Sequence, residues 1–81
     1  MIRARFYIKF KDCDSDFRPI KWPIKYPYWC TGQNSDSFVI VAYADSIEQI
    51  EELWPEAYNI EANEVQEIVF TTRFQKPEWY K

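Results

Sequence analysis

Three prolines spaced by four residues constrain this 81-residue chain more than any other feature. Pro19, Pro23 and Pro27 stand in a stretch whose even positions are apolar or aromatic. Proline has no backbone N–H, and alternate residues of an extended chain point their N–H groups to the same side. All three missing donors therefore fall on one edge. The stretch predicts an edge strand or a polyproline-like segment with its outer side closed, either against aggregation or to recognise a partner.

The N-terminal residues predict a strand with one buried face. Apolar side chains occupy every even position from Ile2 to Phe10, which is the period of a half-buried strand. The odd positions form the solvent face, and they are Arg3, Arg5, Tyr7 and Lys9.

The apolar run 38–44 predicts a central strand that is covered on both faces, preceded by a polar loop over 31–37. A capping box of Ser46 and Gln49 then predicts the start of a helix, which Pro55 limits to about two turns. The apolar stripe of this helix is Ile47, Ile50, Leu53 and Trp54, and its solvent face carries Glu48, Glu51 and Glu52.

A last strand is expected over 64–72, and the aromatic tail that follows is expected to dock back on the domain. These elements predict a small α+β fold of order β-β-β-α-β, with a mostly antiparallel sheet and one short helix packed on one face. No linker composition divides the chain, so residues 1–81 are read as a single domain.

Cysteine use and hydropathy indicate a cytoplasmic protein. The N-terminus lacks the apolar core of a signal peptide, and no apolar run is long enough to span a bilayer, so no membrane partner is expected. Two thiols in such a chain, Cys13 and Cys30, are expected to be free and partly buried.

The composition argues against an enzyme. Histidine is absent and there is one glycine, which removes His-based catalysis and glycine-rich phosphate loops. Asp12, Asp14 and Asp16 resemble the start of a calcium loop, but Phe17 and Pro23 occupy the positions that need Gly and Glu. We therefore expect no catalytic residue, no metal site and no cofactor.

Charge is divided along the chain. Residues 1–29 hold seven basic and three acidic residues, a net charge of +4, whereas residues 30–81 hold three basic and ten acidic residues, a net charge of −7. Basic residues interleaved with aromatics suit single-stranded nucleic acid, whose phosphates and bases they contact. This candidate site comprises Arg3, Arg5, Tyr7, Lys9, Lys21 and Lys25. The acidic net charge of −3 argues against it.

Protein binding is the leading hypothesis at this point. Trp, Tyr and Arg dominate interface hot spots and gather in one segment, while the acidic helix suits a basic partner. The candidate residues are Arg18, Lys21, Trp22, Lys25, Tyr26, Tyr28 and Trp29, with Glu48, Glu51 and Glu52 of the helix. The sequence does not decide whether a second copy of the chain is also a partner.

The motif Arg18-Pro19, Trp22-Pro23 and Pro27-Tyr28-Trp29-Cys30-Thr31-Gly32 resembles a family of small uncharacterised phage and prophage proteins. The resemblance covers most of residues 18–79, and its RPxxWPxxxPYWCTG-like pattern carries no assigned activity or functional residue. It implies a context in the host cytoplasm. Small acidic phage proteins are frequently accessory factors that modulate a host enzyme, for example by inhibiting a nucleic-acid-targeting defence system such as CRISPR.

Overall fold

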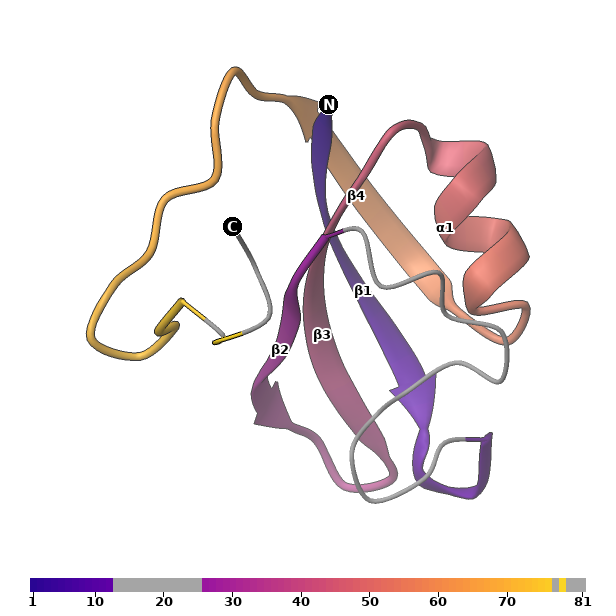
Figure 1. The fold of residues 1–81 in the computed structure, drawn as a ribbon. Helices are drawn as coiled ribbons and strands as arrows, with labels where there is room; N and C mark the ends of the chain where they lie inside the picture. Colours follow the sequence, from indigo (N-terminus) through magenta and orange to yellow (C-terminus); the bar gives the residue numbers. More distant parts are fainter. Residues whose placement is uncertain (13–25, 77, 79–81) are drawn as a thin grey trace.

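A computed structural model describes residues 1–12, 26–76 and 78 of the chain (Figure 1). Four strands form one sheet of order β2-β3-β1-β4, with a single helix, α1, on one face. In chain order the elements are β1 (Ile2–Lys9), the 3-10 turn η1 (Phe10–Asp12), β2 (Tyr28–Gln33), β3 (Ser37–Ala44), α1 (Ile47–Leu53) and β4 (Tyr58–Glu64). The predicted α+β fold class and element order are confirmed.

Every pair of neighbouring strands is antiparallel. Since β3 and β4 are both antiparallel to β1, the two strands joined by α1 run parallel with β1 between them. This is the split β-α-β arrangement of ferredoxin-like sheets. It places α1 across β1 and β3, the two inner strands, and leaves β2 and β4 as edges.

The alternation predicted from Ile2 is confirmed as far as Lys9, but Phe10 lies in η1 and is 39% exposed, so the prediction that it belongs to the buried face of the strand is wrong. Ile2, Ala4, Phe6 and Ile8 are buried under α1, and the odd residues lie on the opposite face. β3 is buried on both of its faces except at the half-buried Phe38, as a central strand requires. Its register with β1 pairs Phe6 with Ile40 and Arg5 with Val41, so core and outer side chains stay in separate rows.

Strand β2 is an edge strand, as predicted, but it begins later in the chain and ends later than the sequence indicated. Pro27 is buried just before it, and the Pro27 carbonyl accepts a hydrogen bond from the Tyr43 N–H. Thr31, Gly32 and Gln33 continue the strand through a register shift, so the prediction of a loop over these three residues is wrong. Pro19 and Pro23 lie outside the described residues.

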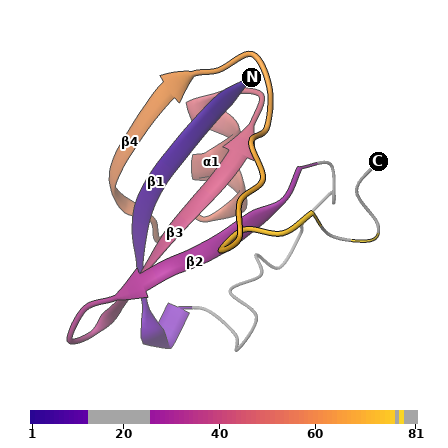
Figure 2. The ribbon, with the colours of Figure 1, turned by 90° about the vertical axis from the view of Figure 1, so that its left-hand side faces the viewer.

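The last strand is Tyr58–Glu64, and the prediction of a strand over 64–72 is wrong. In β4, Ile60 and Ala62 pack against the core, and the register shifts near Asn59, whose φ is 52°. This left-handed residue interrupts the regular strand pattern, and the alternate positions of β4 are polar, so the sequence gives only a weak strand signal here. Residues 65–76 contain no strand and cross the sheet instead (Figure 2).

Helix α1 begins and ends as predicted. The Ser46 hydroxyl accepts the Gln49 N–H at 3.3 Å, and the Gln49 side chain accepts the Asp45 N–H at 2.8 Å. The helix ends at Leu53, two residues before Pro55. Ile50 and Trp54 are buried as expected, but Ile47 is 42% exposed because the helix packs on the sheet mainly through its second turn.

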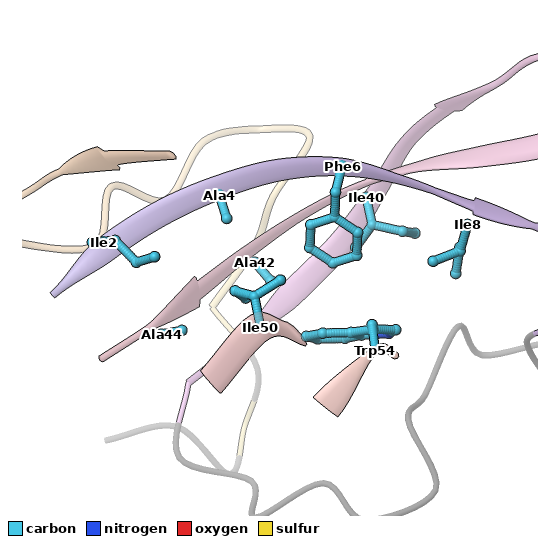
Figure 3. Close-up of a cluster of buried hydrophobic side chains, with 9 residues drawn as sticks. All are labelled: Ile2, Ala4, Phe6, Ile8, Ile40, Ala42, Ala44, Ile50 and Trp54. Carbon is cyan, nitrogen blue, oxygen red and sulfur yellow. The ribbon is translucent and has the colours of Figure 1, made fainter. Parts of the chain in front are cut away.

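The core lies between α1 and the sheet. Figure 3 shows Ile50 and the Trp54 ring facing Phe6 of β1. The Phe6 and Trp54 ring centroids are 5.0 Å apart, and the Tyr28 ring meets Trp54 edge-on at 5.4 Å. Such aromatic pairs add about 0.5–1.5 kcal/mol each beyond the area that they bury. A single seven-residue helix thus closes this face of the sheet.

Two isoleucines of α1 offer a matched test of this packing. Ile50→Ala removes a fully buried side chain, and we expect the free energy of unfolding to fall by about 2–5 kcal/mol. Ile47→Ala truncates an exposed side chain on the same helix and should change it by about 0.5 kcal/mol or less. Urea unfolding measures the free energy of unfolding of both variants. Equal losses of this free energy in the two variants would contradict the assigned burial.

Candidate functional site

The sheet face opposite α1 is divided into a covered half and an open half. Figure 2 shows residues 65–76, here called the C-terminal strap, crossing β3 and β2 on this face. Phe74 of the strap is buried, and its ring stacks on Trp29 of β2 at 4.0 Å and lies parallel to the Tyr43 ring of β3 at 6.3 Å. Among the residues that the structure describes, the strap therefore covers the β2–β3 half and leaves the β1–β4 half open.

The open half carries a row of cations, each beside an aromatic ring. The Arg3 Cζ lies 5.8 Å from the Trp29 ring centroid, the Arg5 Cζ lies 5.5 Å from that of Tyr7, and the Lys9 Nζ lies 5.5 Å from that of Tyr58. We call these six residues the β1 face. Each contact is within the range of a cation–π interaction, worth about 0.5–1 kcal/mol at exposed sites.

Strand geometry puts the three cations in line. Arg3, Arg5 and Lys9 all point to the outer face of one strand, where alternate residues are about 6.6–7 Å apart. Arg3 and Arg5 are exposed, and neither forms an ion pair within the described part of the chain. A guanidinium held over a ring keeps its N–H donors at its edge, so both groups can still bind an anion.

Aromatic rings of β1 and β4 pack against each other beside the row of cations. Tyr7 and Tyr58 are cross-strand partners of β1 and β4, and their rings stack with centroids 5.5 Å apart. Tyr7 is half-buried, with Tyr58 and Arg5 both beside it. Glu61 of β4 is the cross-strand partner of Arg5 and places one negative charge at the margin of the face.

A hydrogen-bonded chain fixes the end of the row at Lys9. The Lys9 ammonium donates to the Asp36 carboxylate at 2.5 Å, and the buried Ser37 hydroxyl donates to the same carboxylate at 2.9 Å. The Ser37 and Tyr58 oxygens are 2.5 Å apart. Because serine has one proton and gives it to Asp36, the Tyr58 hydroxyl is the donor in this last bond.

The residues expected to bind a protein are not gathered into one surface. Tyr26 donates its hydroxyl proton to Asp45 at 2.8 Å, and Tyr28 packs on the core. Trp29 lies on the sheet face opposite α1, where its ring stacks on Phe74. Arg18, Lys21, Trp22 and Lys25 lie outside the described residues. Glu48, Glu51 and Glu52 are exposed on α1, on the far side of the sheet from the β1 face.

Metal and thiol chemistry find little support among the residues described. Over 1–12, 26–76 and 78 no three His, Cys, Asp or Glu residues are close enough to hold a metal ion. Asp14 and Asp16 of the predicted turn lie outside these ranges. Cys30 is a free, half-buried thiol that donates to the Gly32 carbonyl at 3.0 Å, whereas Cys13 is not described.

None of the described helices is long and apolar enough to cross a membrane.

The sequence predicts the three cations of the β1 face but not two of the aromatic rings beside them. The nucleic-acid site predicted from the sequence lacks Tyr58, and the sequence places Trp29 among the protein-binding residues instead. The pattern Tyr58-x-Ile60-x-Ala62 offered a weak strand signal that could have placed Tyr58 beside β1. Contacts such as that of Trp29 with Phe74 depend on tertiary structure and leave no local signal.

Comparison with known protein families finds no family that matches this chain, and neither curated proteins nor solved structures give a match. The chemistry of the site itself is therefore the guide to function.

The hydrogen-bonded chain can be tested by titration. Hydrogen bonds from Lys9 and from Ser37 hold the pKa of Asp36 below its ordinary value of 3.8. A carboxylate with a lowered pKa stabilises the fold above its unfolded pKa, and this stabilisation is lost as the pH falls below about 4.

We expect the pKa of Asp36, measured as the midpoint of an NMR titration of its carboxyl resonance, to rise toward the ordinary value in Lys9→Met. Lys11→Met, which removes an exposed lysine two residues away, should leave it unchanged. An equal response to both substitutions would mean that the contact between Lys9 and Asp36 is not the cause.

Proposed function

We propose that this chain is a non-enzymatic binding module and that the β1 face is its surface for single-stranded nucleic acid. The observation that carries the proposal is the pair of exposed guanidinium groups, Arg3 and Arg5, each held over a ring on an open sheet face. Basic groups that follow the backbone, combined with aromatic rings, are the general means of holding single strands. Four-stranded sheets commonly present such residues on the face opposite their helices.

The geometry of the row suits an extended anion. Arg3 and Arg5 are about 6.6–7 Å apart along β1, so neighbouring anionic groups of one strand can each meet a guanidinium. Charge-assisted bonds from arginine to phosphate are about twice as strong as neutral hydrogen bonds. A ring beneath each guanidinium restricts its rotamers, which lowers the entropy lost when the ligand binds.

The acidic net charge does not remove this surface. Glu48, Glu51 and Glu52 lie on α1, so the core and the sheet separate them from the β1 face. Charges are screened over about 8 Å at physiological ionic strength, so the local field is set mainly by nearby groups. The affinity should nevertheless be modest, because Glu61 is adjacent to Arg5 and only two or three cations are engaged.

A host protein is the second candidate partner. Arg, Tyr and Trp are the residue types of interface hot spots, and the β1 face contains all three. The resemblance to phage and prophage proteins favours this candidate, in the form of a cytoplasmic accessory factor that modulates a host enzyme. The acidic face of α1 would then offer a further contact for a basic partner.

Binding to a fluorescent oligothymidylate of about 12 nucleotides, followed by anisotropy, tests the proposal. With two or three phosphates contacted, log K should fall with log salt at a slope of about −1.4 to −2. Arg3→Ala and Arg5→Ala should each weaken binding roughly threefold or more and make the slope shallower by about 0.7. Glu61→Gln removes the neighbouring negative charge and should strengthen binding.

Lys11→Ala is the matched control, because it removes an exposed positive charge outside the row. If it weakens binding as much as Arg5→Ala, the attraction is not specific to the β1 face. Absence of any salt-dependent binding at micromolar protein would leave the protein partner as the better candidate.

A further inference from the structure

Trp29 carries a large aromatic surface of the β1 face, and a side chain of the strap covers it. The Phe74 ring lies nearly parallel to the indole, with 4.0 Å between ring centroids and 13° between planes. The Arg3 guanidinium reaches the same indole from β1. Trp29 therefore lies beside a guanidinium that could bind a phosphate of a nucleic acid, and its indole offers a flat surface on which a base could stack.

The other rings of the face are engaged by neighbours within the sheet. Tyr7 stacks with Tyr58 and supports Arg5, and the Tyr58 ring also meets Lys9. A base could reach these rings only by separating side chains of paired strands. Phe74, in contrast, belongs to a segment without helix or strand, so the indole can be uncovered with the sheet intact.

Hydrogen bonds near both ends of the strap and ring contacts of Phe70 and Phe74 hold it in place. It leaves β4 through a hydrogen bond from the Val65 N–H to the Met1 carbonyl. A turn at its far end is closed by hydrogen bonds between Thr71 and Phe74. Between them Val69 is 59% exposed, whereas Phe74 is only 4% exposed. Phe74 is therefore the most deeply buried apolar residue of the strap, and the half-buried Phe70 packs against it with 5.0 Å between ring centroids.

We propose that Trp29 is a base-stacking residue and that Phe74 occupies the place of the base until a ligand displaces the strap. The inference rests on the proposed function and specifies how that site is controlled. An aromatic side chain and a nucleobase are both flat π systems that compete for one face of the indole. Where the competent state is only partly populated, the apparent dissociation constant rises in inverse proportion to that fraction.

The test compares oligothymidylate binding by the full-length chain and by variants of the covering ring. Phe74→Ala removes the competitor, and we expect the affinity to rise on the order of tenfold, within the range known for one base–aromatic stack. Phe74→Leu keeps apolar cover and should give a smaller rise. Trp29→Leu in the Phe74→Ala background should abolish the gain.

Val69→Ala is the matched control, since it alters an exposed strap residue and should leave the affinity unchanged. Circular dichroism shows whether each variant is folded, and Phe74→Leu serves if Phe74→Ala is not. A gain of affinity that depends on Trp29 supports the proposal.

The outcomes separate the inference from the proposed function. If the wild type binds through Arg3 and Arg5 but neither Phe74 variant binds more tightly, the inference is overturned and the proposed function stands. Weaker binding by a folded Phe74 variant also overturns it, because Phe74 would then be part of the binding surface. If neither the wild type nor the variants bind, both fail.

Discussion

The burial of β3 on both faces is the constraint on which the rest of the structure depends. Its apolar side chains alternate between two sides of the sheet, so each side needs a cover. On one side α1 supplies Ile50, and Trp54 follows directly at the end of the helix. On the other side the strap supplies Phe74. In the described part of the chain Phe74 contacts rings of β2 and β3, whereas Arg3 and Arg5 on the same side of β1 are exposed, and the candidate site lies around these two arginines.

The sequence was sufficient where structure follows from local pattern. The alternation from Ile2 to Lys9, the apolar run from 38 to 44 and the capping box at Ser46 each depend on neighbouring residues, and each was confirmed. The last strand was not predictable in this way. Asn59 adopts a left-handed conformation and the register shifts beside it, while β-branched residues further on give a stronger strand signal.

The same distinction applies to the candidate site. A period of two puts Arg3, Arg5, Tyr7 and Lys9 on one face without knowledge of the fold. Their partners come from elsewhere: Tyr58 through the pairing of β4, and Trp29 through the bulged pairing of β2 with β3. Strand register and order decide these contacts, and neither follows from composition. Sequence could therefore supply the charges of the site and the Tyr7 ring, but not the rings of Trp29 and Tyr58.

The cover of β3 and the proposed binding surface share one aromatic side chain, Trp29. Phe74 contributes to stability because it covers Tyr43 and Trp29, yet the same contact removes an indole face from any ligand. A ligand that stacks on Trp29 can replace part of the cover that it displaces, so the net cost of moving the strap is smaller than the loss of Phe74 alone. Stability of the free chain and affinity for such a ligand are thus expected to change in opposite directions at this position, which is characteristic of residues kept for control of a site rather than for packing alone.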